Sequence, residues 1–365
     1  LRIPPLFFWA LQKADVRDHL SMETTPGTFN GSGHSPSSER QVLRVLVPLL
    51  DSLIFVTGLT GNVLVQRVLI GRKKQQRRNG TNILLLNLSV ADLLQLLCVP
   101  FHATSIALAR WVFGDFLCKA VSFMGVACSS ASVFTLAALA INRYITLLHP
   151  SKAFRFQLTW YFCTVMLLIW VPSLAVASPQ FAFRGTRVTD SVYCYAFMTD
   201  ASQVFYASTL FVLGFAVPLT TIVIMYSRIY CFLRSKRASV QSRLTDRYHT
   251  QVTRISILLV LVFTLCWLPS YVLLLLLVQG SAPHGAAFPV SAQLLAFSST
   301  IANPVLYVFI SEKFRQDLQR LALPGCCRRH MPCKLPPMTL AQGHYDEAPG
   351  FLQDMELNGH IWTML

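Results

Sequence analysis

Seven long apolar segments, separated by short polar and basic stretches, constrain this chain more than any other feature of its sequence. They lie at about residues 45–70, 82–108, 117–148, 158–177, 202–233, 252–279 and 288–310. Each has the roughly 20 residues that a helix needs to cross a bilayer. Only 13% of the residues are charged, where a soluble domain has about 25%. The sequence therefore predicts an all-α membrane protein, a seven-transmembrane helix bundle over residues 45–310, and excludes soluble enzymes.

The basic residues predict the orientation of this bundle. Of the 31 Lys and Arg residues, 20 fall in the loops that share a side with the C-terminal segment, nine fall on the other side, and two lie at span ends. Loops with an excess of Lys and Arg lie on the cytoplasmic side of a membrane. We therefore expect an extracellular N-terminus and a cytoplasmic C-terminus. Because topology and anionic lipids account for the charge of +15, we expect membrane lipids and no nucleic acid as partners.

The parts of the chain outside the bundle are expected to be disordered or to form one short helix, and they carry candidate modification sites. Residues 1–44 and 324–365 are polar, and we expect both to be largely disordered. Asn30 begins a glycosylation sequon. Residues 311–323 place apolar and basic side chains on different helical faces, which predicts a helix on the membrane surface. Cys326 and Cys327 follow it and predict palmitoylation.

Two further partners are expected on the cytoplasmic side. After residue 311 only Thr339 and Thr363 can be phosphorylated on a hydroxyl of Ser or Thr, so arrestin binding driven by the tail should be weak. Any regulation by phosphorylation should map to the loop between the fifth and sixth segments, which carries Ser235, Ser239, Ser242, Thr245 and Thr250. Thr363-Met364-Leu365 matches a ligand of PDZ scaffold domains, which bind a peptide as an added strand.

Each apolar segment carries one polar or proline-containing cluster. In chain order the clusters are Gly61-Asn62, Leu88-Ser89-Val90-Ala91-Asp92, Cys118 with Asn142-Arg143-Tyr144, Trp170 with Pro179, Pro218 with Tyr226, Phe263 with Cys266-Trp267-Leu268-Pro269, and Asn303-Pro304-Val305-Leu306-Tyr307. This order and spacing resembles the rhodopsin-like (class A) G-protein-coupled receptors over about residues 45–327, and looks most like their galanin, allatostatin and somatostatin branch. The resemblance implies a plasma-membrane receptor that is not an enzyme and activates heterotrimeric G proteins.

The resemblance also implies a disulfide between Cys118 and Cys194, both of which would lie in the oxidising compartment, where a disulfide can persist. The bond would hold residues 180–199 over the mouth of the bundle. In that loop, residues 181–184 and 192–195 flank a polar turn and could form a hairpin.

Asp92 is an ionisable residue inside a span, which is costly and indicates a functional site. The resemblance implies an allosteric sodium ion at Asp92, with a polar pocket completed by Asn62, Ser132, Thr300 and Asn303. The alternative is a neutral, hydrogen-bonded Asp92 with a packing role. No other cofactor is expected.

The resemblance implies a further set of residues for activation and G-protein coupling. They are Asn142, Arg143, Tyr144, Tyr226, Phe263, Trp267, Pro269, Asn303, Pro304 and Tyr307. Relatives usually have an acidic residue where this chain has Asn142. A neutral hydrogen bond is weaker than a charge-assisted one, so we expect a less stable resting state and raised basal signalling.

Two residues that other receptors of this kind need for their ligands are missing here, and this narrows the class of ligand. Position 297 holds Phe where a retinal pigment needs Lys, and position 125 holds Gly where amine receptors place an acid. The expected ligand contacts are largely aromatic and apolar: His102, Ser122, Val126, Ser129, Tyr206, Phe211, Trp267, Tyr271 and Gln293. Helix packing is the alternative role for each.

Loop charges add a polar rim to this expected site. Asp115, Arg184, Arg187, Asp190 and Asp200 are expected there, where solvated charges contribute little each. We therefore favour a neuropeptide ligand, with a lipid or fatty acid as the alternative.

Two other classes of protein fit the sequence less well. A transporter would need paired half-repeats and charges at the bilayer midplane, and we expect Asp92 alone to meet that last condition. A membrane hydrolase would need a metal or nucleophile motif, and neither His-Glu-x-x-His nor Gly-x-Ser-x-Gly occurs in the chain.

Overall fold

The computed structural model describes residues 36–72, 80–148, 159–188, 192–196, 200–236, 243–279, 287–310 and 312–322. Its helices are α2 (Pro36–Gly71), α4 (Gly80–Leu96), α5 (Val99–Leu108), α6 (Gly114–Leu148), α8 (Thr159–Phe183), α9 (Asp200–Phe211), the π-helix η1 (Val212–Ala216), α10 (Val217–Lys236), α11 (Arg243–Val278), α12 (Ala287–Ile310) and α13 (Glu312–Ala322). The strands β1 (Arg184–Val188) and β2 (Val192–Ala196) pair as an antiparallel hairpin.

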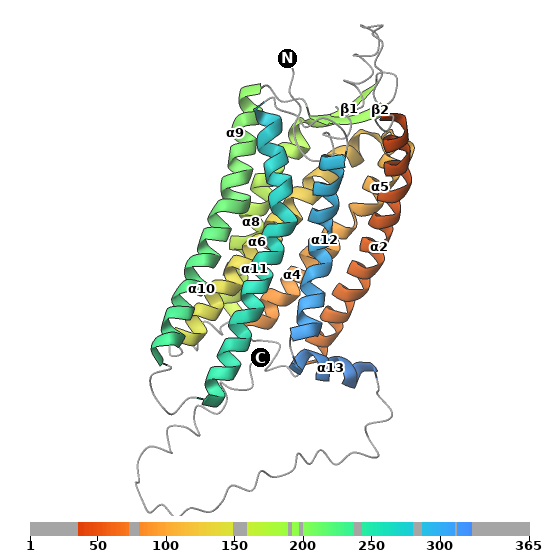
Figure 1. The fold of residues 1–365 in the computed structure, drawn as a ribbon. Coiled ribbons are helices and arrows are strands. Elements are labelled where there is room, and N and C mark those ends of the chain that lie inside the picture. Colours follow the sequence, from red (N-terminus) through yellow and green to blue (C-terminus); the bar gives the residue numbers. More distant parts are fainter. Residues whose placement is uncertain are drawn as a thin grey trace, which may run out of the picture.

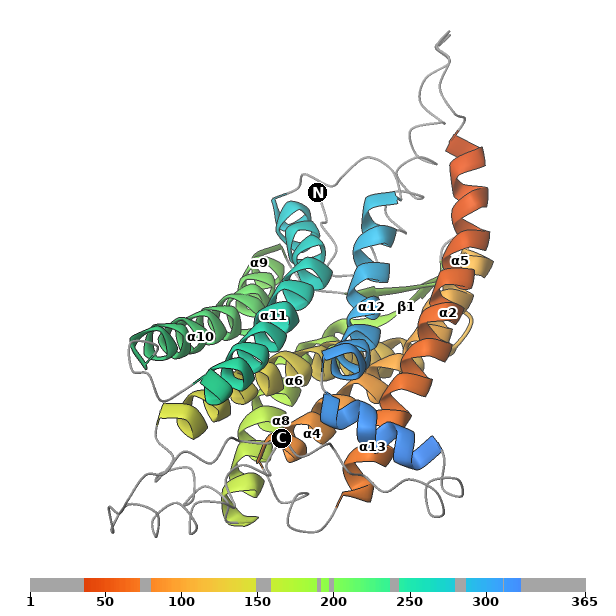
Figure 2. The ribbon, with the colours of Figure 1, turned by 60° about the horizontal axis from the view of Figure 1, so that its bottom comes forward.

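The long helices form seven rods packed side by side (Figures 1 and 2). One rod consists of α4 and α5, and another consists of α9, η1 and α10. Within the described residues, five helical segments are long and apolar enough to cross a membrane, and Val260–Leu276 is a shorter apolar segment of α11. The all-α seven-helix membrane bundle predicted from the sequence is confirmed.

Two of the rods are divided into separate helical segments next to prolines. The first break separates α4 from α5, where the Cys98 N–H donates to the Gln95 carbonyl at 3.0 Å and Pro100 stands in the first turn of α5. The second break is the π-helix η1, which lies just before Pro218. Because proline has no N–H to donate one turn back, the hydrogen-bond ladder must change at such positions.

A polar network ties three helices together inside the core. Asn87 Nδ2 of α4 donates to Thr135 Oγ1 of α6 at 2.7 Å, and Trp170 Nε1 of α8 donates to Asn87 Oδ1 at 2.9 Å. Buried apolar residues such as Leu88 and Phe263 pack around it. Outward-facing apolar side chains, among them Phe205, are exposed, as expected of a surface covered by lipid.

The short helix α13 lies across the end of the bundle opposite the β hairpin (Figures 1 and 2). Phe314 is buried against Val65, Val68 and Leu69 of α2. Arg72 Nε donates to Asp317 Oδ2 at 3.0 Å. An apolar face on the bundle and an ion pair at the end of α2 therefore fix this helix.

Several boundaries differ from those expected, and some expectations lie outside the described residues. Helix α2 begins at Pro36 instead of residue 45, because polar residues extend the apolar helix beyond the span. Helix α8 continues to Phe183, so the first arm of the hairpin starts at Arg184 and not at residue 181. Residues 1–35 and 324–365 lie outside the described residues, and with them Asn30, Cys326 and Cys327.

Candidate ligand-binding site

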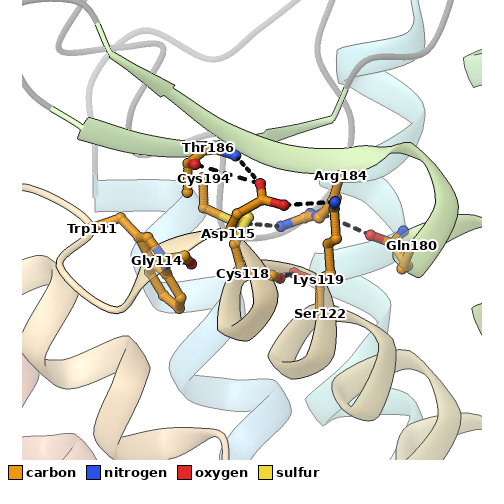
Figure 3. Close-up of a disulfide and its surroundings, with 10 residues drawn as sticks. All are labelled: Trp111, Gly114, Asp115, Cys118, Lys119, Ser122, Gln180, Arg184, Thr186 and Cys194. Carbon is orange, nitrogen blue, oxygen red and sulfur yellow. Dashed lines mark hydrogen bonds and ion pairs between the residues drawn. A yellow bond between two sulfur atoms is a disulfide. The ribbon is translucent and has the colours of Figure 1, made fainter.

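A disulfide joins the β hairpin to the bundle. The Cys118–Cys194 bond is present, with the two Cα atoms 5.6 Å apart. Cys118 lies in the second turn of α6 and Cys194 in β2, where it pairs with Thr186 of β1 (Figure 3). The disulfide predicted through the resemblance is confirmed, and it holds the hairpin across this end of the bundle.

Two more contacts hold the hairpin. Asp115 Oδ1 accepts a hydrogen bond from the Thr186 backbone N–H at 2.7 Å, and Asp115 Oδ2 lies 2.6 Å from Lys119 Nζ (Figure 3). The Trp111 backbone N–H donates to the Val192 carbonyl at 2.8 Å. Asp115, expected as a rim charge for a ligand, is thus already bound by groups of the protein.

A cavity of about 120 Å³ lies beneath this hairpin, lined by residues of α4, α5, α6, α8, β1, α9, α11 and α12. Seven of the nine residues expected to contact the ligand line it: His102, Ser122, Val126, Ser129, Trp267, Tyr271 and Gln293. Gly125 and Phe297, the positions that excluded amine and retinal ligands, line it too. Most of the ligand contacts predicted from the sequence therefore lie in the lining of this cavity.

Tyr206 and Phe211 do not line the cavity. The Tyr206 hydroxyl donates to the Val176 carbonyl at 3.0 Å and accepts from Gln180 Nε2 at 3.2 Å. Phe211 packs edge-on against Tyr271, with ring centroids 6.1 Å apart. In this structure both side chains serve helix packing, the alternative role for them.

Arg184 was expected to be a solvated rim charge and is instead buried, with 4% of its surface exposed, in the lining of the cavity. Its Nε donates to Gln180 Oε1 at 2.7 Å (Figure 3). Burial lowers the pKa of the Arg184 guanidinium to about 10, so it remains a cation at pH 7. Gln180 lies in the last turn of α8 and Arg184 is the first residue of β1, so the junction of the two elements brings the side chains together.

A second buried carboxylate, Asp51, lies near the start of the first predicted span and was not among the site residues predicted from the sequence. Asp51 Oδ2 lies 2.6 Å from His102 Nδ1, and the two side chains are 0% and 1% exposed. The sequence signal was a lone acid in the apolar first segment, where an ionisable residue is costly, as it is at Asp92.

The polar pocket expected at Asp92 is partly assembled. Asp92 Oδ1 accepts from Ser132 Oγ at 3.2 Å, and Oδ2 accepts from Asn303 Nδ2 at 2.8 Å. Asn62 instead donates from Nδ2 to the Thr300 carbonyl at 2.9 Å. A buried carboxylate beside a hydroxyl supplies oxygen ligands of the kind that hard cations prefer, so the residues present fit a sodium ion.

An aromatic ladder descends from the cavity into the core. Tyr271 packs on Phe215 with ring centroids 5.0 Å apart, Phe215 on Phe263 at 6.2 Å, and Phe263 on Trp267 at 6.3 Å. Trp267 lines the cavity and Phe263 is buried below it. Three of these rings belong to α11, which Pro269 interrupts. A shift of Trp267 would therefore be transmitted directly to the core.

The remaining coupling residues lie towards the α13 end. Asn142, Arg143 and Tyr144 occupy the last turns of α6, and Asn142 Nδ2 donates to Thr81 Oγ1 of α4 at 3.0 Å. Tyr226 packs against the core cluster, and Pro304 interrupts α12. The side chain of Tyr307 lies outside the described residues.

The seven-helix bundle holds a cavity that is covered at one end by a disulfide-bonded hairpin. The sequence matches the family described as "7 transmembrane receptor (rhodopsin family)" over residues 61–307. The chain belongs to this family.

Curated relatives cover most of the chain. It is 32% identical to galanin receptor type 1 of Rattus norvegicus over 80% of this chain and 88% of that protein. It is 35% identical to somatostatin receptor type 4 of Rattus norvegicus over 83% of this chain and 81% of that protein. Galanin receptor type 1 of Homo sapiens is 33% identical over 74% of this chain and 79% of that protein.

Proposed function

We propose that this protein is a plasma-membrane receptor for an extracellular peptide and that it activates heterotrimeric G proteins. The observation that carries the proposal is the similarity to galanin and somatostatin receptors over most of both chains, from 31% to 35% identity. The N-terminus would be extracellular and the C-terminus cytoplasmic, in accord with the charge of the loops.

The cavity supports a peptide over a free lipid. It opens beneath a hairpin whose backbone offers additional contacts, and it holds a buried cation, Arg184, together with several polar side chains. A peptide could insert one end between Trp267 and Gln293 and lie across the hairpin with the rest. A fatty acid would satisfy Arg184 but would leave the polar groups of α4 and α12 without partners.

The G protein is expected to bind at the end of the bundle opposite the hairpin. Arg143 and the end of α11 would receive the G protein, the Asp92 pocket would hold an allosteric sodium ion, and membrane lipids would surround the bundle. Arrestin is proposed from the hydroxyl residues at and between the ends of α10 and α11, and a PDZ scaffold from residues 363–365, which lie outside the described residues.

Nucleotide exchange on purified heterotrimeric G proteins tests the proposal. Membranes that contain the receptor are exposed to a peptide panel, including galanin and somatostatin, and to a panel of fatty acids and lysolipids. We expect at least one peptide to accelerate exchange, and Arg143→Ala to abolish that response while peptide binding persists. Acceleration by lipids alone would contradict the peptide assignment.

A further inference from the structure

Two buried carbonyl oxygens in the lining of the cavity lack hydrogen-bond partners within the described part of the chain. They are Gln95 Oε1 of α4 and Gln293 Oε1 of α12. The two side chains are 3% and 7% exposed. A buried acceptor left unsatisfied keeps its full desolvation penalty, so two of them in one cavity lining indicate that a donor from outside the protein occupies this place.

His102 of α5 lines the same cavity and adds a third hydrogen-bond acceptor to the lining. Its Nδ1 lies 2.6 Å from the Asp51 carboxylate, which accepts only, so the proton is placed on Nδ1. In the tautomer that carries its proton on Nδ1, the ring offers a lone pair at Nε2. The Asp51 carboxylate that accepts from Nδ1 polarises the ring and strengthens a hydrogen bond that Nε2 accepts.

The cavity is therefore polarised. The acceptors Gln95, His102 and Gln293 come from α4, α5 and α12, whereas the cation Arg184 comes from β1 beside the end of α8. Between them lie apolar surfaces, including Val126 and Leu274. A ligand carboxylate suits Arg184 and is disfavoured at the three acceptors.

We propose that Gln95, His102 and Gln293 form a subsite for an N–H donor group of the ligand, a carboxamide or an ammonium, joined to an apolar body that packs on Trp267 and Tyr271. This inference rests on the proposed function only in taking the cavity as the ligand site. Asp51 acts as a positioning residue that fixes the ring of His102.

Three small probes of matched shape test the subsite on the purified receptor in lipid nanodiscs. They are 3-phenylpropanamide, 3-phenylpropylammonium and methyl 3-phenylpropanoate, and the ester has the same aromatic body but no N–H. The readout is the rise in Tm with probe concentration, because a ligand that binds the folded state stabilises it by mass action. We expect the amide or the ammonium to bind at least tenfold more tightly than the ester.

Gln95→Leu and Gln293→Leu should each reduce this preference severalfold and leave ester binding nearly unchanged. Gln203→Leu is the matched control, because Gln203 is also buried, at 4% exposed, but does not line the cavity. The preference should survive that substitution. Whichever of the amide and the ammonium binds more tightly identifies the donor group.

The proposal would be overturned by equal binding of all three probes, by binding of none of them, or by a preference that survives both cavity substitutions. In each case water would be the partner of the buried acceptors in the lining. The measurement requires no G protein. A donor preference without peptide-driven nucleotide exchange would therefore contradict the proposed function alone, and the converse result would contradict the subsite alone.

Discussion

Asn142 of α6 donates a hydrogen bond from Nδ2 to Thr81 Oγ1 of α4 at 3.0 Å, next to Arg143. This neutral bond joins two helices at the end of the bundle where G-protein coupling is proposed. A carboxylate at position 142 would accept from the Thr81 hydroxyl and attract the neighbouring guanidinium. Charge-assisted bonds are roughly twice as strong as neutral ones.

Asn142→Asp should therefore stabilise the resting state and lower ligand-free signalling. A change of about 1.4 kcal/mol corresponds to a tenfold change in the ratio of two states, so we expect basal nucleotide exchange to fall severalfold at matched surface expression. Thr81→Val removes the acceptor and should move basal exchange in the opposite direction. An unchanged basal rate in Asn142→Asp would mean that Asn142 is a neutral variation.

The Cys118–Cys194 bond should be required for a folded mouth of the bundle. It closes a sequence separation of 76 residues and holds β2 against α6. Loss of a native disulfide costs about 2–5 kcal/mol in small secreted domains, so Cys118→Ala or Cys194→Ala should abolish surface delivery or peptide binding. Cys163→Ala, at an exposed free cysteine, is the control. Normal binding by a receptor whose two thiols are free in mass spectrometry would refute this requirement.

The buried Asp51 and His102 side chains should be coupled energetically. Asp51→Leu removes the partner of a buried ring nitrogen, which costs about 1–3 kcal/mol, and should lower the Tm of the purified receptor. The double variant Asp51→Leu/His102→Leu replaces both polar groups and should recover most of the loss, as replacement of buried pairs by apolar residues often does. Additive losses in a double-mutant cycle would show that the pair is not coupled.

Position 214 should require a glycine, because the Tyr271 hydroxyl lies too close to leave room for a larger side chain. A Cβ at position 214 would stand 2.6 Å from Tyr271 Oη but 3.6 Å from its Cζ. Gly214→Ala should therefore lower the Tm, with a cost of about 1–3 kcal/mol as for other overpacked sites. Tyr271→Phe removes the clashing oxygen, so it should rescue Gly214→Ala. If the double variant is as unstable as Gly214→Ala alone, the clash is not the cause.

The sequence predicted the fold because membrane spans are encoded locally, in runs of apolar residues that need no knowledge of distant contacts. The roles of Trp267, Asn303 and Cys118 were predicted through the resemblance to a receptor family, which rests on the order and spacing of the clusters in the spans. Hydropathy could not place the start of α2, because the polar residues after Pro36 extend the helix past the apolar run.

Side-chain orientation accounts for the rest of the differences. Tyr206 points toward Val176 and Gln180 instead of the cavity, which depends on how α9 is rotated against α8. Arg184 is buried because α8 runs on to Phe183 and turns the next residue inward. Asp51 meets His102 across two helices. Each result depends on helix packing, which a single sequence does not report.

Peptide-driven nucleotide exchange in the wild-type receptor and in Gly125→Trp tests the central claim, that a ligand in the cavity below the hairpin activates the protein. Gly125 lines the cavity and a Cβ there meets no atom within 4 Å, so a Trp side chain can fill the space. At matched surface expression, we expect a peptide that accelerates exchange in the wild type to be at least tenfold less potent on Gly125→Trp. Equal potency on the two receptors, or no peptide response in the wild type, would contradict the account.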